Sequence, residues 1–406
     1  MSTARTPGLI FIFLTLLLDV IGFGLIIPVL PKLLEQMTGG DLSTASRWGG
    51  LLMFAYAGMQ FMFSPIVGGL SDRYGRRPVI LAALFAFSID FLIQGFAPSI
   101  WWFFLGRILA GITGATFTTA MAYIADVSPP EKRSQNFGLV GAAFGMGFII
   151  GPLLGGLVSH YWGIRAPFFA AAGLAMLNWL YGFFILPESL KPENRRPFDW
   201  KRANPLGSLM RLGHYPVILS LVASLVCIYI AGFANQSTWT YITIAKFGWD
   251  ERMVGFSLAF VGLMTGIVQG VLTRVLIPRL GQSRSVYIGL GFYTIGFVLF
   301  AFASQDWMMF AFMIPFSLGG LAGPSLQGII SNQVPSNAQG ELQGALTSLI
   351  SATSIVGPLV MTNLFAYFTR PDAPVVFPGA PFLLGAVLSL ASMLLALRSL
   401  RKKVTA

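Results

Sequence analysis

Residues 8–30 read GLIFIFLTLLLDVIGFGLIIPVL, a run in which Asp19 is the only charged side chain. A helix needs about 20 predominantly apolar residues to cross the hydrocarbon core of a bilayer. Eleven further runs of this kind follow in the 406-residue chain. The predicted spans lie near 8–30, 48–70, 78–97, 99–123, 135–159, 163–186, 215–242, 252–277, 285–304, 306–332, 341–368 and 379–399. The expected fold class is therefore an all-α membrane protein with twelve transmembrane helices.

The composition excludes a soluble protein. Hydrophobic residues make up 55% of the chain and charged residues only 10%, whereas soluble domains carry about 25% charged residues. Cys227 is the single cysteine, so the chain contains neither an internal disulfide nor a cysteine metal site. The first apolar run continues to Pro28, which is too long for a cleaved signal peptide.

The basic residues indicate how the chain is oriented. The net charge of +11 lies in short loops between apolar runs, a distribution that argues against nucleic acid as a partner. If the N-terminus is cytoplasmic, 19 of the 26 Lys and Arg residues fall on the cytoplasmic side and six on the other, while Arg107 lies within a span. Because basic residues concentrate in cytoplasmic loops, we expect both termini in the cytoplasm.

An internal repeat with an offset of 206 residues divides the chain. It relates Gly75 to Gly281, Gly114 to Gly320, and the pair Gly151-Pro152 to Gly357-Pro358. Two similar six-span halves are typical of secondary transporters, whose binding site lies between the repeats near the midplane. The predicted organisation is an N-terminal half at 1–186, a cytoplasmic linker at 187–214 and a C-terminal half at 215–406.

Three ionisable residues fall inside predicted spans: Asp19, Asp90 and Arg107. A charge at the bilayer centre costs about 2.5–3.5 kcal/mol on insertion scales, so such residues usually face a wet cavity or a partner. One interpretation is that they couple transport to protons or bind a cationic substrate. The other is a structural ion pair that orders the first, third and fourth spans.

The stretch GGLSDRYGRR at 68–77 joins the second and third spans. Asp72, Arg73, Arg76 and Arg77, together with Asp126 at the end of the fourth span, form a predicted cytoplasmic latch, which we call the latch cluster. Carboxylate and guanidinium groups at helix ends can hold one face shut and release it during rocking. A simple positive-inside anchor would require the arginines but neither Asp72 nor the glycines.

Glycines dominate the fifth span, where Gly151, Pro152, Gly155 and Gly156 form one motif. Small residues spaced four apart allow close helix contact, so packing is their expected role. Polar residues expected to face a cavity in the second half are Asn235, Gln236, Gln269, Gln327 and Asn332. The alternative for each is a hydrogen bond between helices.

No enzyme or ATPase signature is present. His160 and His214 lack spaced carboxylate ligands, so no metal site and no nucleophile arrangement are predicted, and the chain contains no GxxxxGK[ST] loop. We expect no cofactor.

These motifs resemble the major facilitator superfamily. The 68–77 loop resembles its signature between helices 2 and 3, LGRILAG at 105–111 its helix 4 motif, and GPLLGG at 151–156 its helix 5 antiporter motif. The stretches LDVIGFGLIIPVLP at 18–31, YIAD at 123–126 and TSIVGPL at 353–359 resemble tetracycline efflux pumps of Gram-negative bacteria. This resemblance implies drug export in exchange for protons, with Asp19, Asp90 and Arg107 at the functional positions.

Two positions depart from those pumps. Tyr293 stands where their helix 9 carries an aspartate, and Thr265 where some members carry a histidine. Tyr293 is therefore included among the predicted substrate-binding residues, and tetracycline itself is left open as the substrate.

The expectation is a monomeric, proton-coupled exporter of an amphipathic drug in a bacterial inner membrane. Its partners would be a small-molecule substrate, protons and the lipid bilayer. The alternative is a metabolite uniporter or importer in which the intramembrane aspartates are structural.

Overall fold

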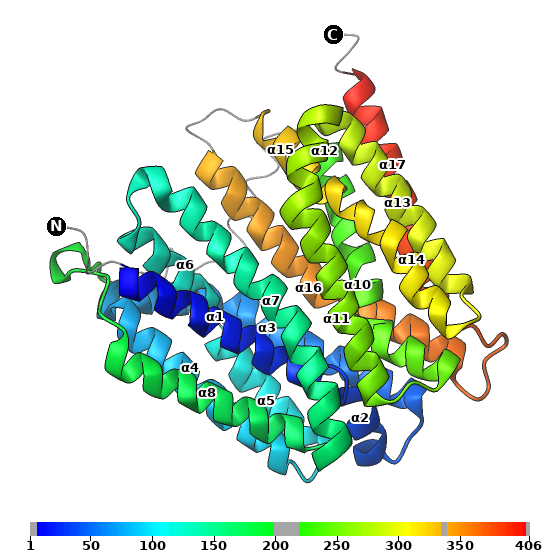
Figure 1. Ribbon diagram of the computed structural model, residues 1–406, viewed down its shortest axis with the longest axis horizontal. Coiled ribbons are helices and arrows are strands. Elements are labelled where there is room, and N and C mark those ends of the chain that lie inside the picture. The colour runs from blue at the N-terminus through cyan, green and yellow to red at the C-terminus, as the bar shows by residue number, and fades with distance from the viewer. Residues whose placement is uncertain (1–5, 115, 199–218, 334–338, 403–406) are drawn as a thin grey trace. The chain divides into compact units, whose positions relative to one another are not determined.

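The computed structural model describes residues 6–114, 116–198, 219–333 and 339–402, and within these ranges every regular element is a helix (Figure 1). Residues 199–214 of the predicted linker lie outside the described residues. The first half contains α1 (Thr6–Ile26), α2 (Leu30–Thr38), α3 (Leu42–Tyr74), α4 (Arg76–Phe96), α5 (Ile100–Thr113), α6 (Thr116–Val127), α7 (Pro130–Trp162), α8 (Ala166–Ile185) and the short turn η1 (Pro192–Asn194). The second half contains α10 (Leu219–Phe247), α11 (Glu251–Ile267), η4 (Val268–Leu272), α12 (Thr273–Leu280), α13 (Gln282–Phe302), α14 (Asp306–Leu318), η5 (Gly319–Leu321), α15 (Ala322–Ser331), α16 (Gln339–Thr369) and α17 (Ala380–Lys402).

Twelve helical segments of the described chain are long and apolar enough to cross a membrane, which confirms the predicted fold class. Their ends differ from the prediction in places. The first span ends at Ile26 because Pro28 disfavours helical backbone in the residue before it, whereas Pro31 lies in the first turn of the next helix, α2. The second span runs from Leu42 to Tyr74, longer than the predicted 48–70, because polar residues continue the helix beyond its apolar part.

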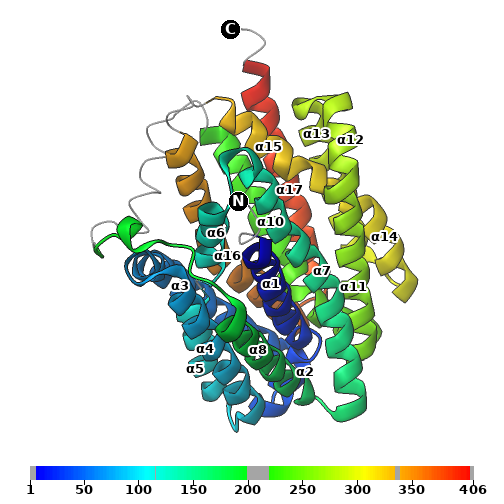
Figure 2. The ribbon, with the colours of Figure 1, turned by 60° about the vertical axis from the view of Figure 1, so that its left-hand side comes forward.

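The first compact unit comprises residues 1–39, 55–204 and 250–259. Within it α1 packs against α7 and α8, and α4 packs against α5 and α8. Figures 1 and 2 both show α1 running alongside α7. Buried apolar side chains between these helices, among them Phe11, Ile80, Leu84 and Val140, form its core.

The second compact unit comprises residues 40–54, 205–249 and 260–406. Here α10 packs against α16 and α17, and α13 packs against α14 and α17. Its core includes Leu221, Leu290, Leu326 and Leu346. Counted by span, these four pairings repeat those of the first unit, so the helices of both halves are packed in the same pattern.

The repeat extends to backbone detail. Gly75 and Gly281, 206 residues apart, have φ angles of 108° and 80° at the turns that follow the second and eighth spans. Glycine adopts such angles without the steric cost that a Cβ brings. In the fourth span α5 ends at Thr113, directly before Gly114, and in the tenth α14 ends at Leu318, directly before the 3-10 turn η5 that contains Gly320. The predicted pair Gly114 and Gly320 therefore lies where an α-helix ends in each half.

A cation caps the third span of each half. Arg165, at the start of α8, donates to the carbonyl oxygens of Gly95 and Ala97, each at 2.9 Å. Lys246, near the end of α10, donates to the carbonyl oxygen of Ala301 at 2.9 Å. Gly95 and Ala301 are related by the 206-residue offset. The last carbonyls of a helix lack partners within it and favour positive charge. An arginine supplies that charge in the first half and a lysine in the second.

Two short segments pack with the unit that contains the other half of the chain. Residues 40–54, which begin α3, belong to the second unit, where the Ser43 hydroxyl donates to the carbonyl oxygen of Ala366 at 2.9 Å. Residues 250–259, which begin α11, belong to the first unit, where Glu251 pairs with Lys32 at 2.8 Å. The start of the second span thus belongs to the second unit, and the start of the eighth span belongs to the first unit.

Candidate functional site

Asp90 is completely enclosed in α4, in the third span. Its Oδ1 accepts a hydrogen bond from Gln94 Nε2 at 2.8 Å, and its Oδ2 lies 3.4 Å from a terminal guanidinium nitrogen of Arg107 on α5. Gly106 packs so closely that a Cβ there would lie 2.5 Å from Oδ1. The structure therefore brings the predicted residues Asp90 and Arg107 together as a buried ion pair.

The ion pair with Asp90 does not use all the hydrogen-bond donors of the Arg107 guanidinium. Its Nε is buried without a hydrogen-bond partner among the described residues. The guanidinium lies over the Tyr56 ring of α3, 5.7 Å from the centroid, a geometry in which the ring face attracts a cation. Gln60, one turn after Tyr56, places its amide 3.4 Å from the Tyr56 hydroxyl and 3.3 Å from the carbonyl oxygen of Gly114.

Asp19 lies on α1 beside the buried amide of Asn178 on α8. Asn178 also ties the preceding turn of α1, because it donates to the carbonyl oxygen of Thr15 at 3.3 Å and accepts from the Thr15 hydroxyl at 3.3 Å. The Tyr56 hydroxyl is within electrostatic range of Arg107, Asp19 and Asp90. One tyrosine therefore stands among all three residues predicted to couple protons.

The motif-based prediction missed Tyr56, Gln60, Gln94 and Asn178. Their signal was present, since Gln60, Gln94 and Asn178 are isolated amides in apolar runs and buried amides require partners. The sequence alone does not indicate which acid each amide would meet.

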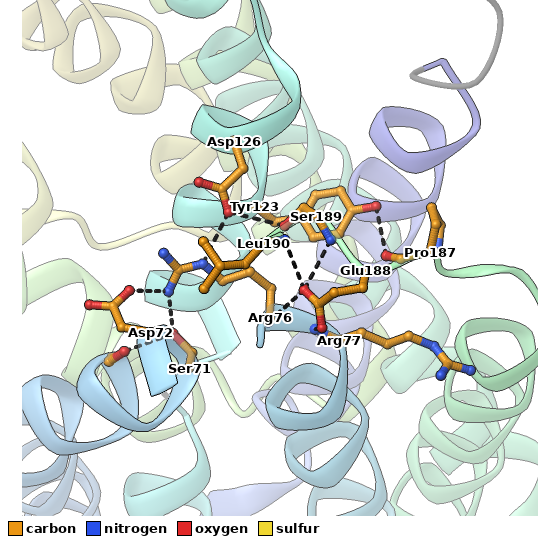
Figure 3. A network of polar contacts seen from close by, with 11 residues as sticks. Ser71, Asp72, Arg76, Arg77, Tyr123, Asp126, Pro187, Glu188, Ser189 and Leu190 are labelled. Carbon is orange, nitrogen blue, oxygen red and sulfur yellow. Dashed lines mark hydrogen bonds and ion pairs between the residues drawn. The ribbon is translucent and has the colours of Figure 1, made fainter. Parts of the chain in front are cut away.

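The latch cluster centres on Arg76, the first residue of α4, whose side chain is largely buried (Figure 3). Its guanidinium contacts Asp72 at 2.5 Å, Asp126 at 3.1 Å and the Ser71 hydroxyl at 2.6 Å. These groups come from the end of α3, the start of α4 and the end of α6, so the structure brings Asp72, Arg76 and Asp126 together.

Arg73 and Arg77 point elsewhere. The Arg73 guanidinium lies over the ring of Tyr74, 5.1 Å from its centroid. Arg77 donates through a terminal nitrogen to the carbonyl oxygen of Phe183 at 2.7 Å. These two arginines were grouped with the latch carboxylates because of their position in the sequence, but the structure directs their side chains to an aromatic ring and to the end of α8.

The segment that follows α8 completes the network (Figure 3). Glu188 accepts hydrogen bonds from the backbone N–H groups of Arg76 at 2.8 Å and Arg77 at 3.3 Å. Ser189 donates to Asp126 at 3.0 Å, and the Tyr123 hydroxyl donates to the carbonyl oxygen of Pro187 at 3.1 Å. This segment thus joins α4, α6 and α8, a role that the sequence did not reveal.

The glycines of α7 form a contact surface for α1. A Cβ on Gly147 would meet Val20, one on Gly151 would lie 2.8 Å from the Gly24 Cα, and one on Gly155 would collide with the backbone of Leu25. Pro152 lies against Gly24 in the same contact. These residues therefore lie where α7 and α1 approach each other closely.

Gly156 faces a different helix. A Cβ there would lie 2.5 Å from the carbonyl oxygen of Glu251 at the start of α11, and one on Gly255 would lie 2.5 Å from the carbonyl oxygen of Pro152. The glycines of α7 therefore bring it into close contact with both α1 and α11.

In the second half, Gln327 on α15 donates to the Tyr229 hydroxyl of α10 at 2.7 Å. Tyr293 on α13 lies within electrostatic range of Tyr229, and its ring packs on Gly319 and Phe316, with centroids 5.0 Å apart in the ring pair. The predicted residues Tyr293 and Gln327 thus both lie near Tyr229, which the sequence did not single out.

The remaining candidates are dispersed. Gln269 lies in the π-helical turn η4 and packs its stem near Gly320; such turns often occur at functional sites. Asn235 is buried in α10, whereas Gln236 is exposed. Asn332 ends α15 and donates to Gln282 at 3.4 Å, so it ties helix ends together.

The counterpart of the Asp90 site in the second half is apolar. The 206-residue offset takes Asp90 to Gly296 and Arg107 to Met313, which is buried. Gly296 packs against the Phe316 side chain, and Phe316 also contacts Phe300 at 5.2 Å between centroids. The positions of the second half that correspond to Asp90 and Arg107 therefore carry no ion pair. Among the described residues no group of His, Cys, Asp and Glu side chains could hold a metal ion.

Comparison with known proteins identifies the family. The profile described as Major Facilitator Superfamily matches residues 12–304 and 230–406. The chain is 42% identical over 359 residues to the class C tetracycline resistance protein of Escherichia coli, covering 88% of this chain and 90% of that protein. It is 40% identical over 356 residues to the class G protein of Vibrio anguillarum, covering 86% and 88%.

Solved structures agree in fold. The human organic anion transporter MFSD10 (TETRAN) matches with a TM-score of 0.71 at 25% identity, covering 97% of this chain and 99% of that chain. A bacterial homologue of the human lysosomal transporter Spinster matches with a TM-score of 0.78 at 16% identity, covering 99% and 98%. With its twelve spans and its relatedness to bacterial tetracycline resistance proteins, the chain is a membrane transporter of the major facilitator superfamily.

Proposed function

We propose that the chain exports a drug-like small molecule, tetracycline or a related amphipathic compound, in exchange for protons by alternating access. The observation that carries this proposal is the buried pair of Asp90 and Arg107 in a relative of tetracycline resistance proteins. An acid enclosed beside a single guanidinium can exist as a carboxylate that the cation compensates or as a neutral acid. Proton uptake there changes the charge of the site, which is the event that a proton-coupled transporter requires.

The other proposed roles follow from the same cycle. Asp19, like Asp90 and Arg107, is within electrostatic range of the Tyr56 hydroxyl. In the proposed cycle Asp19 serves as the second coupling acid. Asp72, Arg76 and Asp126 hold one end of the first six spans together through ion pairs. On the proposed topology, with both termini in the cytoplasm of a bacterium and residues 187–214 as the linker between halves 1–186 and 215–406, this end is cytoplasmic.

The proposed substrate site draws on the second half. There Gln327 bonds Tyr229, Tyr293 packs against the same apolar core as Tyr229, and Gln269 lies in the π-helical turn. Aromatic rings with a few placed hydrogen-bond groups are typical of sites that bind amphipathic molecules. The absence of a carboxylate near Tyr293 in the described chain distinguishes this site from one that binds a cation directly.

The test is exchange in proteoliposomes, with Asp90→Asn compared with the unmodified chain. Asparagine preserves shape but cannot take up a proton. We expect substrate-driven proton movement to disappear while the protein still inserts, and drug resistance of an efflux-deficient host to disappear with it. Unimpaired exchange by Asp90→Asn contradicts the coupling role. Efflux that persists after the pH gradient is collapsed supports the alternative, a uniporter.

A further inference from the structure

The two oxygens of the Asp90 carboxylate have different surroundings. Oδ1 accepts a hydrogen bond of 2.8 Å from Gln94 Nε2, whereas Oδ2 has the longer contact of 3.4 Å with Arg107. Asp90 has no exposed surface, and Gln94 is 1% exposed. The Gln94–Asp90 bond is thus a short, fully enclosed hydrogen bond that the coupling role alone does not explain.

Gly106 seals the same oxygen from the opposite helix. A Cβ at this position would lie 2.5 Å from Asp90 Oδ1 and 3.0 Å from Gln94 Cγ. The backbone of α5 therefore covers Oδ1 and the Gln94 side chain, with room for a hydrogen atom only. Of the two carboxylate oxygens, Oδ2 is the one directed at the charged side chain of Arg107.

We propose that Gln94 is a positioning residue for proton exchange on Asp90: it keeps Oδ1 occupied, so that a proton and Arg107 compete for Oδ2. This inference rests on the proposed function. When a proton binds Oδ2, that oxygen becomes an O–H donor, and a guanidinium has only donors to offer it. Arg107 then separates from Asp90, keeps its charge and retains the Tyr56 ring. When the proton leaves to water, the carboxylate pairs with Arg107 again.

Gln94 can keep this role through the whole cycle. It lies one helical turn from Asp90 on α4, so the two side chains move together, whereas Arg107 belongs to α5. Its amide N–H can donate to Oδ1 both in the carboxylate and in the neutral acid, where Oδ1 is the carbonyl oxygen. No rotation of the amide is needed when the proton arrives.

The charged and titratable groups around Asp90 come from three helices, α5, α3 and α1. Arg107 on α5 is the ionised side chain beside it in the described chain. Tyr56 on α3 faces the same guanidinium, and Asp19 on α1 is within electrostatic range of that tyrosine. Toward α8, α4 presents Ser88, which donates to the carbonyl oxygen of Ala172 at 3.1 Å.

The experiment replaces Gln94 by Met, which has a similar shape but no N–H donor. Ser88→Ala is the matched control, because Ser88 is a buried hydrogen-bonding residue of the same helix outside the site. Both variants are reconstituted with tetracycline as the probe substrate. Three quantities are measured: protons moved per substrate, the pH profile of exchange, and proton leak without substrate.

In Gln94→Met, Oδ1 is free to take a proton while Arg107 stays on Oδ2. We expect at least a twofold lower ratio of protons to substrate, a measurable leak, and a pH profile displaced by about one unit, the size expected for a lost hydrogen bond to a charged group. Ser88→Ala should match the unmodified chain. A Gln94→Met variant with an unchanged ratio and profile overturns the inference.

Two further measurements keep the inference testable if Gln94→Met does not insert. Gly106→Ala forces a methyl group against Oδ1 and the Gln94 side chain and should produce the same uncoupling. Infrared difference spectra should show the carbonyl band of protonated Asp90, identified by its loss in Asp90→Asn, at a hydrogen-bonded frequency; a free carbonyl overturns the inference. Coupled exchange that survives Asp90→Asn contradicts the proposed function itself, whereas loss of coupling there with unaltered Gln94→Met contradicts only the role of Gln94.

Discussion

The carboxylate of Glu188 accepts a hydrogen bond of 2.8 Å from the backbone N–H of Arg76, although the two residues are 112 positions apart. Gly75 precedes α4 and has no side chain with which to cap it. A Cβ at Gly75 would collide with the Glu188 carboxylate. The glycine thus admits a cap from a distant segment, and the negative charge also suits the start of a helix.

Replacing Glu188 by Ala should weaken the network in Figure 3. Loss of a cap costs about 1–2 kcal/mol, so we expect a lower midpoint of thermal unfolding in detergent and a slower exchange rate. Glu193→Ala is the control, because Glu193 is exposed and its contact with Lys191 is 3.7 Å long. Equal stability and exchange in the two variants would show that the Glu188 bonds contribute nothing.

The sequence predicted the elements that depend on local pattern. Apolar runs identified all twelve spans, and isolated charges identified the pair formed by Asp90 and Arg107. It did not reveal Glu188, because a glutamate after a span has the pattern of a solvated loop residue. Its partners are backbone N–H groups, which every residue except proline possesses. Tyr229 was missed for a related reason, since one tyrosine in an apolar run carries no sign of its partner Gln327.

The contact of α1 with α7 should be sensitive to a single methyl group. Gly151→Ala would place a Cβ 2.8 Å from the Gly24 Cα and equally close to the carbonyl oxygen of Ile21. Both are backbone atoms, so the helices must separate, at a cost of about 1–3 kcal/mol for overpacking. We expect reduced thermal stability and impaired exchange.

Gly141→Ala is the matched control on α7, since no neighbouring atom lies within 4 Å of the added Cβ. Alanine favours a helix more than glycine does, so this variant should be as stable as the unmodified chain or more stable. Gly24→Ala perturbs the same contact from α1, and its effect should not add to that of Gly151→Ala. Additive effects would indicate that the two glycines act in separate places.

The hydroxyl of Tyr229 should contribute to substrate binding in the second half. Tyr229→Phe removes the acceptor of the 2.7 Å hydrogen bond from Gln327. We expect KM for the exported drug to rise about two- to tenfold with little change in kcat, which corresponds to one neutral hydrogen bond. Thr294→Val is the control, because its hydroxyl bonds only within α13. Lower stability with an unchanged KM would assign the bond to packing.

The final prediction concerns the ion pair of Lys32 and Glu251. Lys32 lies just after the first span and the latch cluster just after the second, so the two are on opposite sides of the membrane. Glu251 begins α11 but packs in the first unit, where its side chain is 11% exposed and its carbonyl oxygen lies against Gly156. The proposed alternating access requires each end of the pathway to open in turn, so we expect this contact to break during the cycle.

Cross-linking tests this requirement. Cysteines replace Lys32 and Glu251 in a Cys227→Ser background and are joined by a short bifunctional thiol reagent with a reducible bridge. Because the two side chains meet at 2.8 Å, we expect efficient cross-linking, complete loss of exchange and full recovery after reduction. Each single-cysteine variant treated in the same way should remain active. Undiminished exchange by the cross-linked protein would mean that α2 and the start of α11 stay together throughout transport, and that the pathway opens elsewhere.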